Sequence, residues 1–334
     1  NKKWEWLGWF QAAVAFFIAT YYAVIVAWSI SYIGFSVTQA WGADTEGFFF
    51  SKYLNVSDGP LQLGGIQLQI LIPFLAVWLL GYIILSKGIK NGIEKANKII
   101  IPLLLVLTGV IVVRGLTLPG ALDGLNYLFT PDWGSIWKPE VWVAAYGQIF
   151  FSLSIGFAIM ITYASYLPKK TDLVNSAFIT AFSNHGFELF VALGIFGVLG
   201  YMAGVQGVDV AEVSKAGVGL AFVVFPAAIS ALPALKGTVG AVFFITLVFA
   251  GFTSFISIIE AYITGVIDKF NIPRQKALNI FVGISFVVSF IFVTGAGLYV
   301  LDILDYFINN FGIVLGGILE VILVGWFFDL EGLR

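Results

Sequence analysis

The chain has 334 residues, of which 60% are hydrophobic and 11% are charged, and its formal net charge at pH 7 is −2. Its mean hydropathy of +0.97 exceeds what a soluble core requires, so we predict a membrane protein. The absence of cysteine excludes disulfides, thiolate nucleophiles and cysteine-ligated metal centres, and a single histidine argues against a histidine-built metal site.

Apolar runs of about 20 residues predict eight membrane-spanning helices in one all-α polytopic domain, residues 1–334. In chain order the predicted spans are 8–36, 68–87, 96–115, 141–166, 172–203, 238–268, 274–294 and 300–328. Lysine and arginine concentrate in alternate connections, at 2–3, 87–98, 169–170 and 269–276. By the positive-inside rule we expect a protein of the cytoplasmic (inner) membrane in which these connections, and the ends at Asn1 and Arg334, face the cytoplasm.

The chain starts Asn1-Lys2-Lys3, with no initiator methionine and no signal-peptide pattern, and enters a predicted span within a few residues. We therefore expect it to be part of a longer protein.

Inside the first span, Tyr22 carries a hydroxyl that needs a partner, because a tyrosine of the interfacial belt would lie nearer an end. At the cytoplasmic start of the 96–115 span, Gly92 and Pro102 stand ten positions apart. Proline removes a backbone donor and clashes with the preceding turn, so this end can unwind, although an inert kink is the alternative.

The 141–166 span carries an amide, two hydroxyls and a glycine at its middle, at Gln148, Ser152, Ser154 and Gly156. An unsatisfied backbone group is costly in hydrocarbon, so a helix break there survives only where it lines a cavity or binds a ligand. Serines that bond back to carbonyls one turn earlier are the alternative. Together with the aromatic pair Phe151 and Phe157, the pattern favours a ligand site at mid-membrane depth.

Asn184 and Glu188, four residues apart in the 172–203 span, share one helical face. An ionisable residue inside a membrane usually marks an ion or proton pathway, and a structural ion pair is the alternative. We expect His185 to point away from them.

In the 238–268 span, Ala250, Thr253 and Ser254 combine small residues with adjacent hydroxyls. Such oxygens suit a weakly held monovalent cation, and close helix packing explains the same residues equally well. Asp268 and Asp305 fall at span ends, where each could be an ordinary solvated charge. The Gly-x-x-x-Gly spacing of Gly312 and Gly316 suits helix packing, with a homodimer contact as the other use of that face.

Five separated motifs carry a resemblance to a known family. They are Asp123-Gly124-Leu125-Asn126, the run from Gly147 to Phe157 followed by Ile161-Thr162-Tyr163-Ala164-Ser165-Tyr166, Lys215-Ala216-Gly217, Phe249-Ala250-Gly251-Phe252-Thr253-Ser254, and Leu301-Asp302-Ile303-Leu304-Asp305. In this order and spacing the chain resembles the bacterial neurotransmitter:sodium symporter family, and within it the LeuT-type hydrophobic amino acid transporters. The resemblance implies an inverted-repeat helical bundle, here incomplete, in which the eight spans correspond to the family's third to tenth helices.

The resemblance also implies two sodium sites, each completed by the family's first helix. The first would take Ser152, Asn184 and the substrate carboxylate, and the second would take Ala250, Thr253 and Ser254. An apolar pocket for the amino acid would be lined by Ile18, Tyr22, Phe151, Ser152, Ser154, Phe157, Ser254 and Ile258. Close relatives usually have glycine where this chain has Ala158, so we expect the added methyl group to narrow or reshape the pocket near the break.

Gating roles follow from the same resemblance. Phe151 would be the lid, Asp305 half of the outer gate, and Tyr166 and Asp268 partners in the inner gate, while Gly92 and Pro102 match an unwinding element. Glu188 stands where chloride-dependent relatives have a serine, and we assign it with Gln148 to the site that replaces chloride. We therefore expect transport that is independent of chloride, with proton counter-movement through Glu188.

The expected ligands are sodium and a small hydrophobic amino acid in a lipid bilayer, without an organic cofactor or nucleic acid. Three alternatives stay open: a sodium-coupled sugar or nucleobase carrier on the same fold, a non-transporting sensor or scaffold, and an intramembrane enzyme. The last has least support, because the chain lacks the Gly-x-Ser-x-Gly and His-Glu-x-x-His motifs and has no cysteine.

Overall fold

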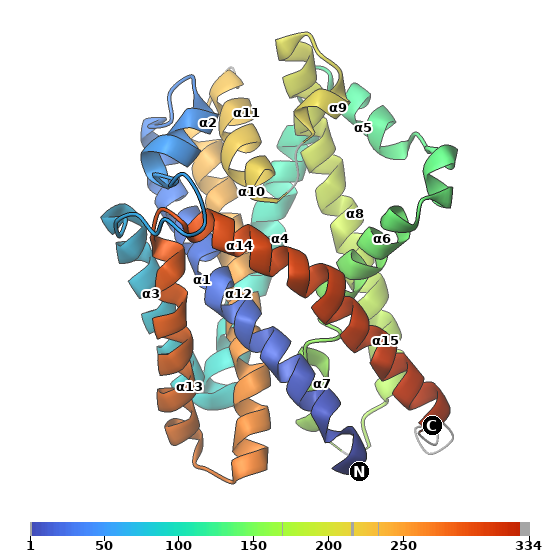
Figure 1. Cartoon of the computed structure of the whole chain (residues 1–334). Helices are drawn as coiled ribbons and strands as arrows, with labels where there is room; N and C mark the ends of the chain where they lie inside the picture. The colour runs from blue at the N-terminus through green and yellow to red at the C-terminus, as the bar shows by residue number, and fades with distance from the viewer. Residues whose placement is uncertain (1, 169, 215–216, 233, 328–334) are drawn as a thin grey trace.

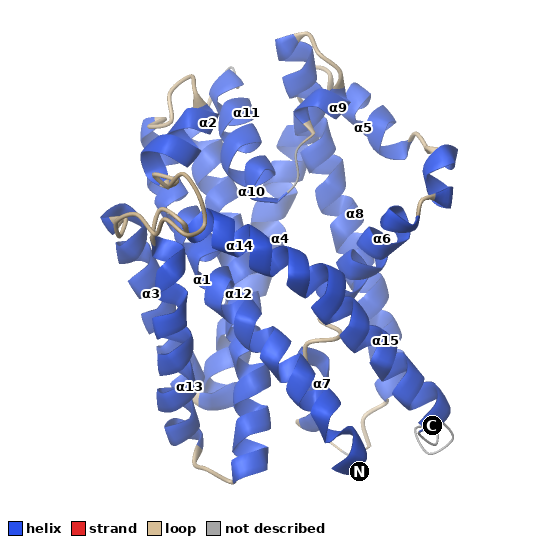
Figure 2. Ribbon diagram, viewed as in Figure 1, coloured by secondary structure: helices blue, strands red, loops and turns tan. Residues whose placement is uncertain are grey.

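A computed structural model describes residues 2–168, 170–214, 217–232 and 234–327, and these residues form a bundle of helices (Figures 1 and 2). Among the described residues, seven helical segments are long and apolar enough to cross a membrane, which confirms an all-α polytopic membrane protein. They are Glu5–Thr38 (α1), Leu68–Ser86 (α3), Ile89–Leu116 (η3 and α4), Leu173–Gln206 (α8), Lys236–Phe270 (α12), Arg274–Val293 (α13 and η6) and Gly297–Phe327 (α14, η7, α15 and η8).

Within the compound segments, η3 is Ile89–Ile93, α4 is Glu94–Leu116, α13 is Arg274–Ser289, η6 is Phe290–Val293, α14 is Gly297–Phe307, η7 is Ile308–Ile313, α15 is Val314–Ile322 and η8 is Leu323–Phe327. Shorter helices fill the connections: η1 (Lys2–Trp4), α2 (Thr45–Gly47), η2 (Phe48–Tyr53), α5 (Ala121–Phe129), η4 (Trp133–Trp137), α9 (Val210–Val213), α10 (Gly217–Gly219), η5 (Leu220–Val224) and α11 (Phe225–Ala231).

The predicted 141–166 span is two short helices, α6 (Pro139–Ser152) and α7 (Ile159–Ser165), separated where the sequence predicted a break. The other predicted spans start and end within a few residues of the observed helices, except that α4 is preceded by η3. Asn1, Lys169, Lys215, Ala216 and residues 328–334, which include parts of our predictions, lie outside the described residues.

Helix α1 forms the centre of the bundle together with α12, along which it packs. It is apolar around its whole circumference, as expected for a helix surrounded by protein. Near one end of α1, Tyr32 is fully buried in an aromatic cluster, and its hydroxyl donates to the Phe222 carbonyl at 3.3 Å. The cluster also includes Trp41, Phe48, Phe49, Tyr53 and Phe244.

Helices α4, α5 and α8 meet along a seam of glycines, where backbone contacts backbone. A Cβ on Gly115 would overlap the Gly194 carbonyl, and a Cβ on Gly200 would lie 2.5 Å from the Gly124 nitrogen. A Cβ on Gly124 would overlap the Phe196 carbonyl oxygen. Small residues permit this close approach, which is the usual way helices pack in membranes.

Replacing Gly124 with alanine is therefore expected to lower the free energy of unfolding by about 1–3 kcal/mol, the usual cost of overpacking. Gly109 of α4 is a matched control, because a Cβ there would find no atom within 4 Å. Thermal unfolding in detergent should show a destabilised Gly124→Ala and an unchanged or stabilised Gly109→Ala. Equal stability of the two variants would mean that the seam opens without cost.

The described N-terminal residues and the turn between α12 and α13 lie at the same end of the bundle, the lower end in Figure 1. At the opposite end, the connection from α5 to α6 contains η4, which is capped by Asp132. Hydrogen bonds from the Ser135 hydroxyl (2.5 Å) and the Gly134 amide (3.0 Å) lower the pKa of the Asp132 carboxyl. We predict that the lower end faces the cytoplasm.

Candidate functional site

The interruption between α6 and α7 is formed by three residues with left-handed backbone conformations. Ser154, Gly156 and Ala158 have φ angles of 59°, 85° and 65°. The amides of Ser154 and Ile155 close the end of α6 on the carbonyls of Phe151 (3.1 Å) and Phe150 (2.8 Å). A left-handed conformation costs roughly 1–2 kcal/mol in residues that carry a Cβ, so packing around the break must hold Ser154 and Ala158 in place.

That packing comes from the glycines of η7 and α15. A Cβ on Gly156 would lie 2.7 Å from the Ile313 carbonyl oxygen, and one on Gly316 would lie 2.6 Å from the Gly156 oxygen. A Cβ on Gly312 would lie 3.2 Å from Val14 of α1. Gly312 and Gly316 therefore serve packing inside the bundle, and a homodimer contact through this spacing stays a prediction.

The two half-helices pack against different neighbours. The half that precedes the break, α6, contacts η7 and α15, whereas α7 contacts α12.

A cavity of about 310 Å³, here called the central cavity, lies beside the break. Eight of the predicted site residues line it, and so do six residues that we did not predict. The eight are Tyr22, Phe151, Ser152, Ser154, Phe157, Thr253, Ser254 and Ile258, and the six are Asn97, Ile101, Ile159, Met160, Tyr163 and Ser257. Its volume is at the lower end of the range for small-molecule sites.

Hydroxyl groups from three helices meet around the central cavity. Tyr22 of α1 and Ser254 of α12 both line it. The Thr253 hydroxyl donates to the Ala250 carbonyl at 2.9 Å, and the Tyr163 hydroxyl donates to Ser257 at 2.7 Å.

Apolar walls complete the cavity. The rings of Phe151 and Phe157 stack with centroids 5.7 Å apart. Ile18, which we expected in the lining, is fully buried and is not among the lining residues, because it lies one helical turn from Tyr22 inside the bundle. Its side chain packs within the protein core instead.

A chain of polar contacts runs from the break into α8. The Asn184 amide nitrogen donates to the Ser152 hydroxyl at 3.0 Å and to Glu188 Oε1 at 3.2 Å. His185 Nδ1 lies 3.2 Å from Glu188 Oε2, so our expectation that His185 points away is wrong. Gln148 is exposed and has no described contact with Glu188.

A second cavity of about 420 Å³, here called the lower cavity, lies between α1, α7 and α12. Ala158 lines this cavity and does not line the central one. The expected effect of its methyl group on the substrate pocket stays a prediction. Asp268, Thr264 and Gln11 also line the lower cavity.

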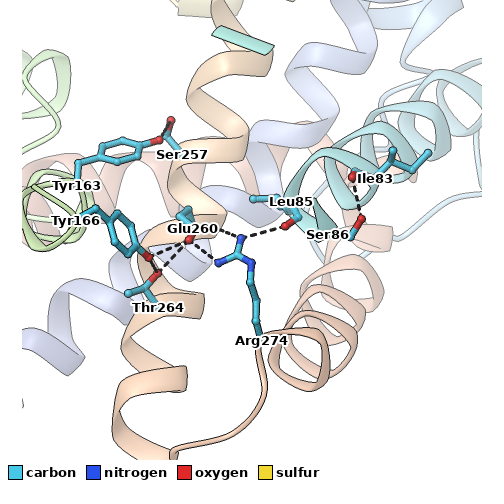
Figure 3. A network of polar contacts seen from close by, with 9 residues as sticks. All are labelled: Ile83, Leu85, Ser86, Tyr163, Tyr166, Ser257, Glu260, Thr264 and Arg274. Atoms are coloured by element: carbon cyan, nitrogen blue, oxygen red, sulfur yellow. Dashed lines mark hydrogen bonds and ion pairs between the residues drawn. The ribbon is translucent and has the colours of Figure 1, made fainter. Parts of the chain in front are cut away.

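Tyr166 takes part in a network around Glu260, which Figure 3 shows from close by. Arg274 holds the Glu260 carboxylate with both terminal nitrogens, at 2.7 and 2.6 Å, and also donates to the Leu85 carbonyl at 3.0 Å. The Tyr166 hydroxyl donates to Glu260 at 3.0 Å and lies 2.6 Å from the Thr264 hydroxyl. Asp268, the other residue that we expected in the inner gate, lines the lower cavity, while the described side-chain hydrogen bonds of Tyr166 go to Glu260 and Thr264.

Glu260 and Arg274 are residues that our sequence analysis missed. A lone carboxylate inside an apolar span was a usable signal, since such a residue usually has a specific partner. The Glu260 side chain is only 1% exposed and that of Arg274 26%, so the pair ties α12, α13 and the end of α3 together from within.

The remaining predicted residues lie on helices that flank the cavities. The Asp305 carboxylate accepts a hydrogen bond from Tyr21 at 3.0 Å, which joins α14 to α1. Gly92 is buried in η3, where a Cβ would overlap the Ile84 carbonyl, and Pro102 lies inside α4, whose helix continues through it.

The chemistry of the cavity fits a monovalent cation. Ser152, Thr253 and Ser254 present hydroxyl oxygens, which hard cations prefer as ligands. The described residues contain no group of three or more histidines, cysteines, aspartates and glutamates that could hold a more demanding metal ion.

Comparisons with known proteins agree with this arrangement. Residues 40–333 match the family described as the sodium:neurotransmitter symporter family. Over all its 334 residues the chain is 46% identical to an uncharacterized sodium-dependent transporter of Methanocaldococcus jannaschii, MJ1319, and covers 68% of it.

Two further relatives match parts of the chain. An uncharacterized sodium-dependent transporter of Haemophilus influenzae is 36% identical over 59% of the chain and 43% of its own length. The sodium-dependent neutral amino acid transporter B(0)AT3 of Mus musculus is 36% identical over 45% of the chain and 24% of its own length. The chain therefore spans only part of each relative. It belongs to the sodium:neurotransmitter symporter family, whose members are transporters and not enzymes.

Proposed function

We propose that the protein containing this chain carries a hydrophobic amino acid together with sodium across the cytoplasmic membrane by alternating access. The observation that carries the proposal is the central cavity, which combines a broken helix, hydroxyl oxygens and apolar walls in one place. A ligand site at an interrupted membrane helix is the arrangement that secondary transporters use. The name of the mouse relative, a neutral amino acid transporter, supports the same substrate class.

The substrate would lie with its two charged ends at fixed polar groups. The Tyr22 hydroxyl would bind the carboxylate, and the Phe151 carbonyl together with Ser154 would bind the amine. Phe157 and Ile258 offer an apolar wall for the side chain. A charged side chain there would be left unpaired, which costs far more than a change of one methylene group.

Two sodium ions would accompany the substrate. One would bind beside Ser152 and Asn184, whose Oγ and Nδ2 atoms are 3.0 Å apart. The other would bind at Ala250, Thr253 and Ser254. A segment outside this chain would complete both sites. No organic cofactor is needed for this function.

Residues on either side of the cavity would control access to it. Phe151 would cover the substrate, Asp305 would belong to the outer gate, and Tyr166 with Asp268 to the inner gate. The first turns of α4, between Gly92 and Pro102, would loosen to admit water from the cytoplasm.

Glu188 supports a prediction about chloride. Its carboxylate is hydrogen-bonded to Asn184, so it supplies a fixed negative charge beside the proposed first sodium site, and proton binding there would reset it on the return step. We therefore expect uptake to be unchanged when chloride is replaced by gluconate. A sharp fall in uptake would contradict this role. A Glu188→Ser variant whose uptake does not increase when chloride is added would contradict it as well.

The proposed function is tested by uptake of labelled leucine and tryptophan into proteoliposomes that contain the complete protein. We expect an inward sodium gradient to drive accumulation and a potassium gradient to fail. Comparing the two amino acids measures how large a side chain the central cavity accepts. If the folded protein accumulates neither, the proposed substrate class is wrong.

A further inference from the structure

On the side of the central cavity that α12 forms, the hydroxyl groups already donate their hydrogens to other protein groups. The Thr253 hydroxyl donates to the Ala250 carbonyl, and the Ser257 hydroxyl donates to the Thr253 carbonyl at 2.9 Å. Ser257 also accepts the hydrogen of Tyr163. Because a hydroxyl has one hydrogen and two lone pairs, these groups can only accept from a molecule in the cavity.

Asn97 adds a further acceptor to the same cavity from α4. Its side-chain oxygen Oδ1 is buried and has no hydrogen-bond partner among the described residues. A buried carbonyl oxygen without a partner is unfavourable, so its position requires a donor or a cation. Together with the Thr253 and Ser257 hydroxyls, it forms a set of oxygens that only a positively polarised guest can satisfy.

Asn97 lies on a segment that is weakened on both sides. Before it, Gly88 has a φ of 77° and η3 forms a π-helical turn. After it, Pro102 lacks the amide that would bond the Lys98 carbonyl in a regular helix. The turn that carries Asn97 can therefore shift without unfolding the rest of α4.

We propose that Asn97 Oδ1 is a further ligand of the sodium ion that Thr253 and Ser254 bind, and that the ion thereby holds the first turns of α4 against α12. The inference deepens the proposed function, on which it rests for the identity of the cation. When the α4 segment moves away, it removes one oxygen from the ion, so opening toward the cytoplasm and sodium release favour each other. By linkage, sodium must stabilise the closed position of this segment to the same extent.

Hydrogen exchange of the complete protein in lipid nanodiscs tests this coupling. Peptides that cover 89–102 are followed by mass spectrometry while sodium replaces choline at constant ionic strength, without amino acid. We expect sodium to slow exchange of this segment in the native protein. In Asn97→Leu, which keeps the branched side-chain skeleton and removes the oxygen, the protection should vanish or need about tenfold more sodium, the effect of losing one contact to a charge.

Two further variants make the experiment specific. Asn97→Asp keeps an oxygen at the site and should retain the protection, and it provides a second reading if Asn97→Leu does not fold. Asn91→Leu makes the same change at an exposed position of the same segment and should behave as the native protein. Sodium protection that is absent from the native protein, or that is unchanged in Asn97→Leu, overturns the proposal.

Uptake measured on the same preparations separates the two ideas. Sodium protection that depends on Asn97, without uptake of leucine or tryptophan, supports the ligand role and refutes the proposed substrate class. Sodium-driven uptake together with unchanged protection in Asn97→Leu supports the transport function and refutes the role of Asn97.

Discussion

Replacement of Arg274 with methionine is expected to lower the free energy of unfolding by about 3–5 kcal/mol, because it leaves the Glu260 carboxylate buried without its cation. The Glu260 side chain is 1% exposed, so water cannot take the place of the guanidinium. Tyr166 and Thr264 would remain as neutral donors, which compensate only part of the lost charge interaction. Unfolding of the complete protein in detergent, followed by tryptophan fluorescence, measures the loss.

Lys98→Met is the matched control for this prediction. Lys98 pairs with Glu94 one turn away, but both side chains are largely exposed, at 73% and 47%. Exposed pairs of this kind contribute about 0.3–0.5 kcal/mol, so the control should be nearly neutral. Removing both charges, with Glu260→Leu and Arg274→Met together, should recover most of the stability. An Arg274→Met variant as stable as the control would show that the buried pair is dispensable.

Asn184→Ala is expected to raise the sodium concentration needed for half-maximal substrate binding by about 10–100-fold, while the protein stays folded. The reason is that the proposed sodium site loses a ligand, and a contact to a charged group contributes about 1.5–3 kcal/mol. The substitution also removes the donor that links Ser152 to Glu188. Titration of substrate binding with sodium, at constant ionic strength, measures the shift.

The control for Asn184 is Asn175→Ala on the same helix. Asn175 is exposed, and its side chain donates to Asp172 at the start of α8 and not to a residue of the break. We expect this variant to keep the native sodium requirement. If Asn184→Ala also keeps it, Asn184 is not a sodium ligand and its contact with Ser152 is structural.

The fold could be predicted closely because membrane helices can be recognised in a sequence by their length and hydropathy. The long apolar runs gave the seven segments to within a few residues, and the polar and small residues between Ser152 and Gly156 located the break. The π-helical turn η3 could not be predicted in the same way, since no composition distinguishes one added residue per turn.

The details of the site depended on directions that the sequence does not contain. Ala158 adopts a left-handed backbone and lines the lower cavity, and it is not among the residues that line the central one. Ile18 shares a helical face with Tyr22, yet the cavity ends before it. For His185 the error was one of periodicity, because residues three apart on a helix also meet.

The pairing of Glu260 with Arg274 depended on a tertiary feature. We assigned Arg274 to a basic connection at the membrane surface, which is where its position at the start of α13 places its backbone. The side chain reaches back to α12 and the Leu85 carbonyl, and this follows only from how the two helices and α3 pack. Charge counts along a sequence cannot show such an inward orientation.

The interrupted span consists of two short helices that can change their angle to each other, unlike a continuous helix. Six residues, Leu153–Ala158, connect α6 to α7 without a continuous helix axis, and each half is fastened to a different partner, α6 to α15 and α7 to α12. A tilt of α12 can therefore carry α7 along and leave α6 in place. In the proposed transport cycle, the two halves of this span can therefore move with different helices, whereas α1, α8 and α12 are uninterrupted along their length.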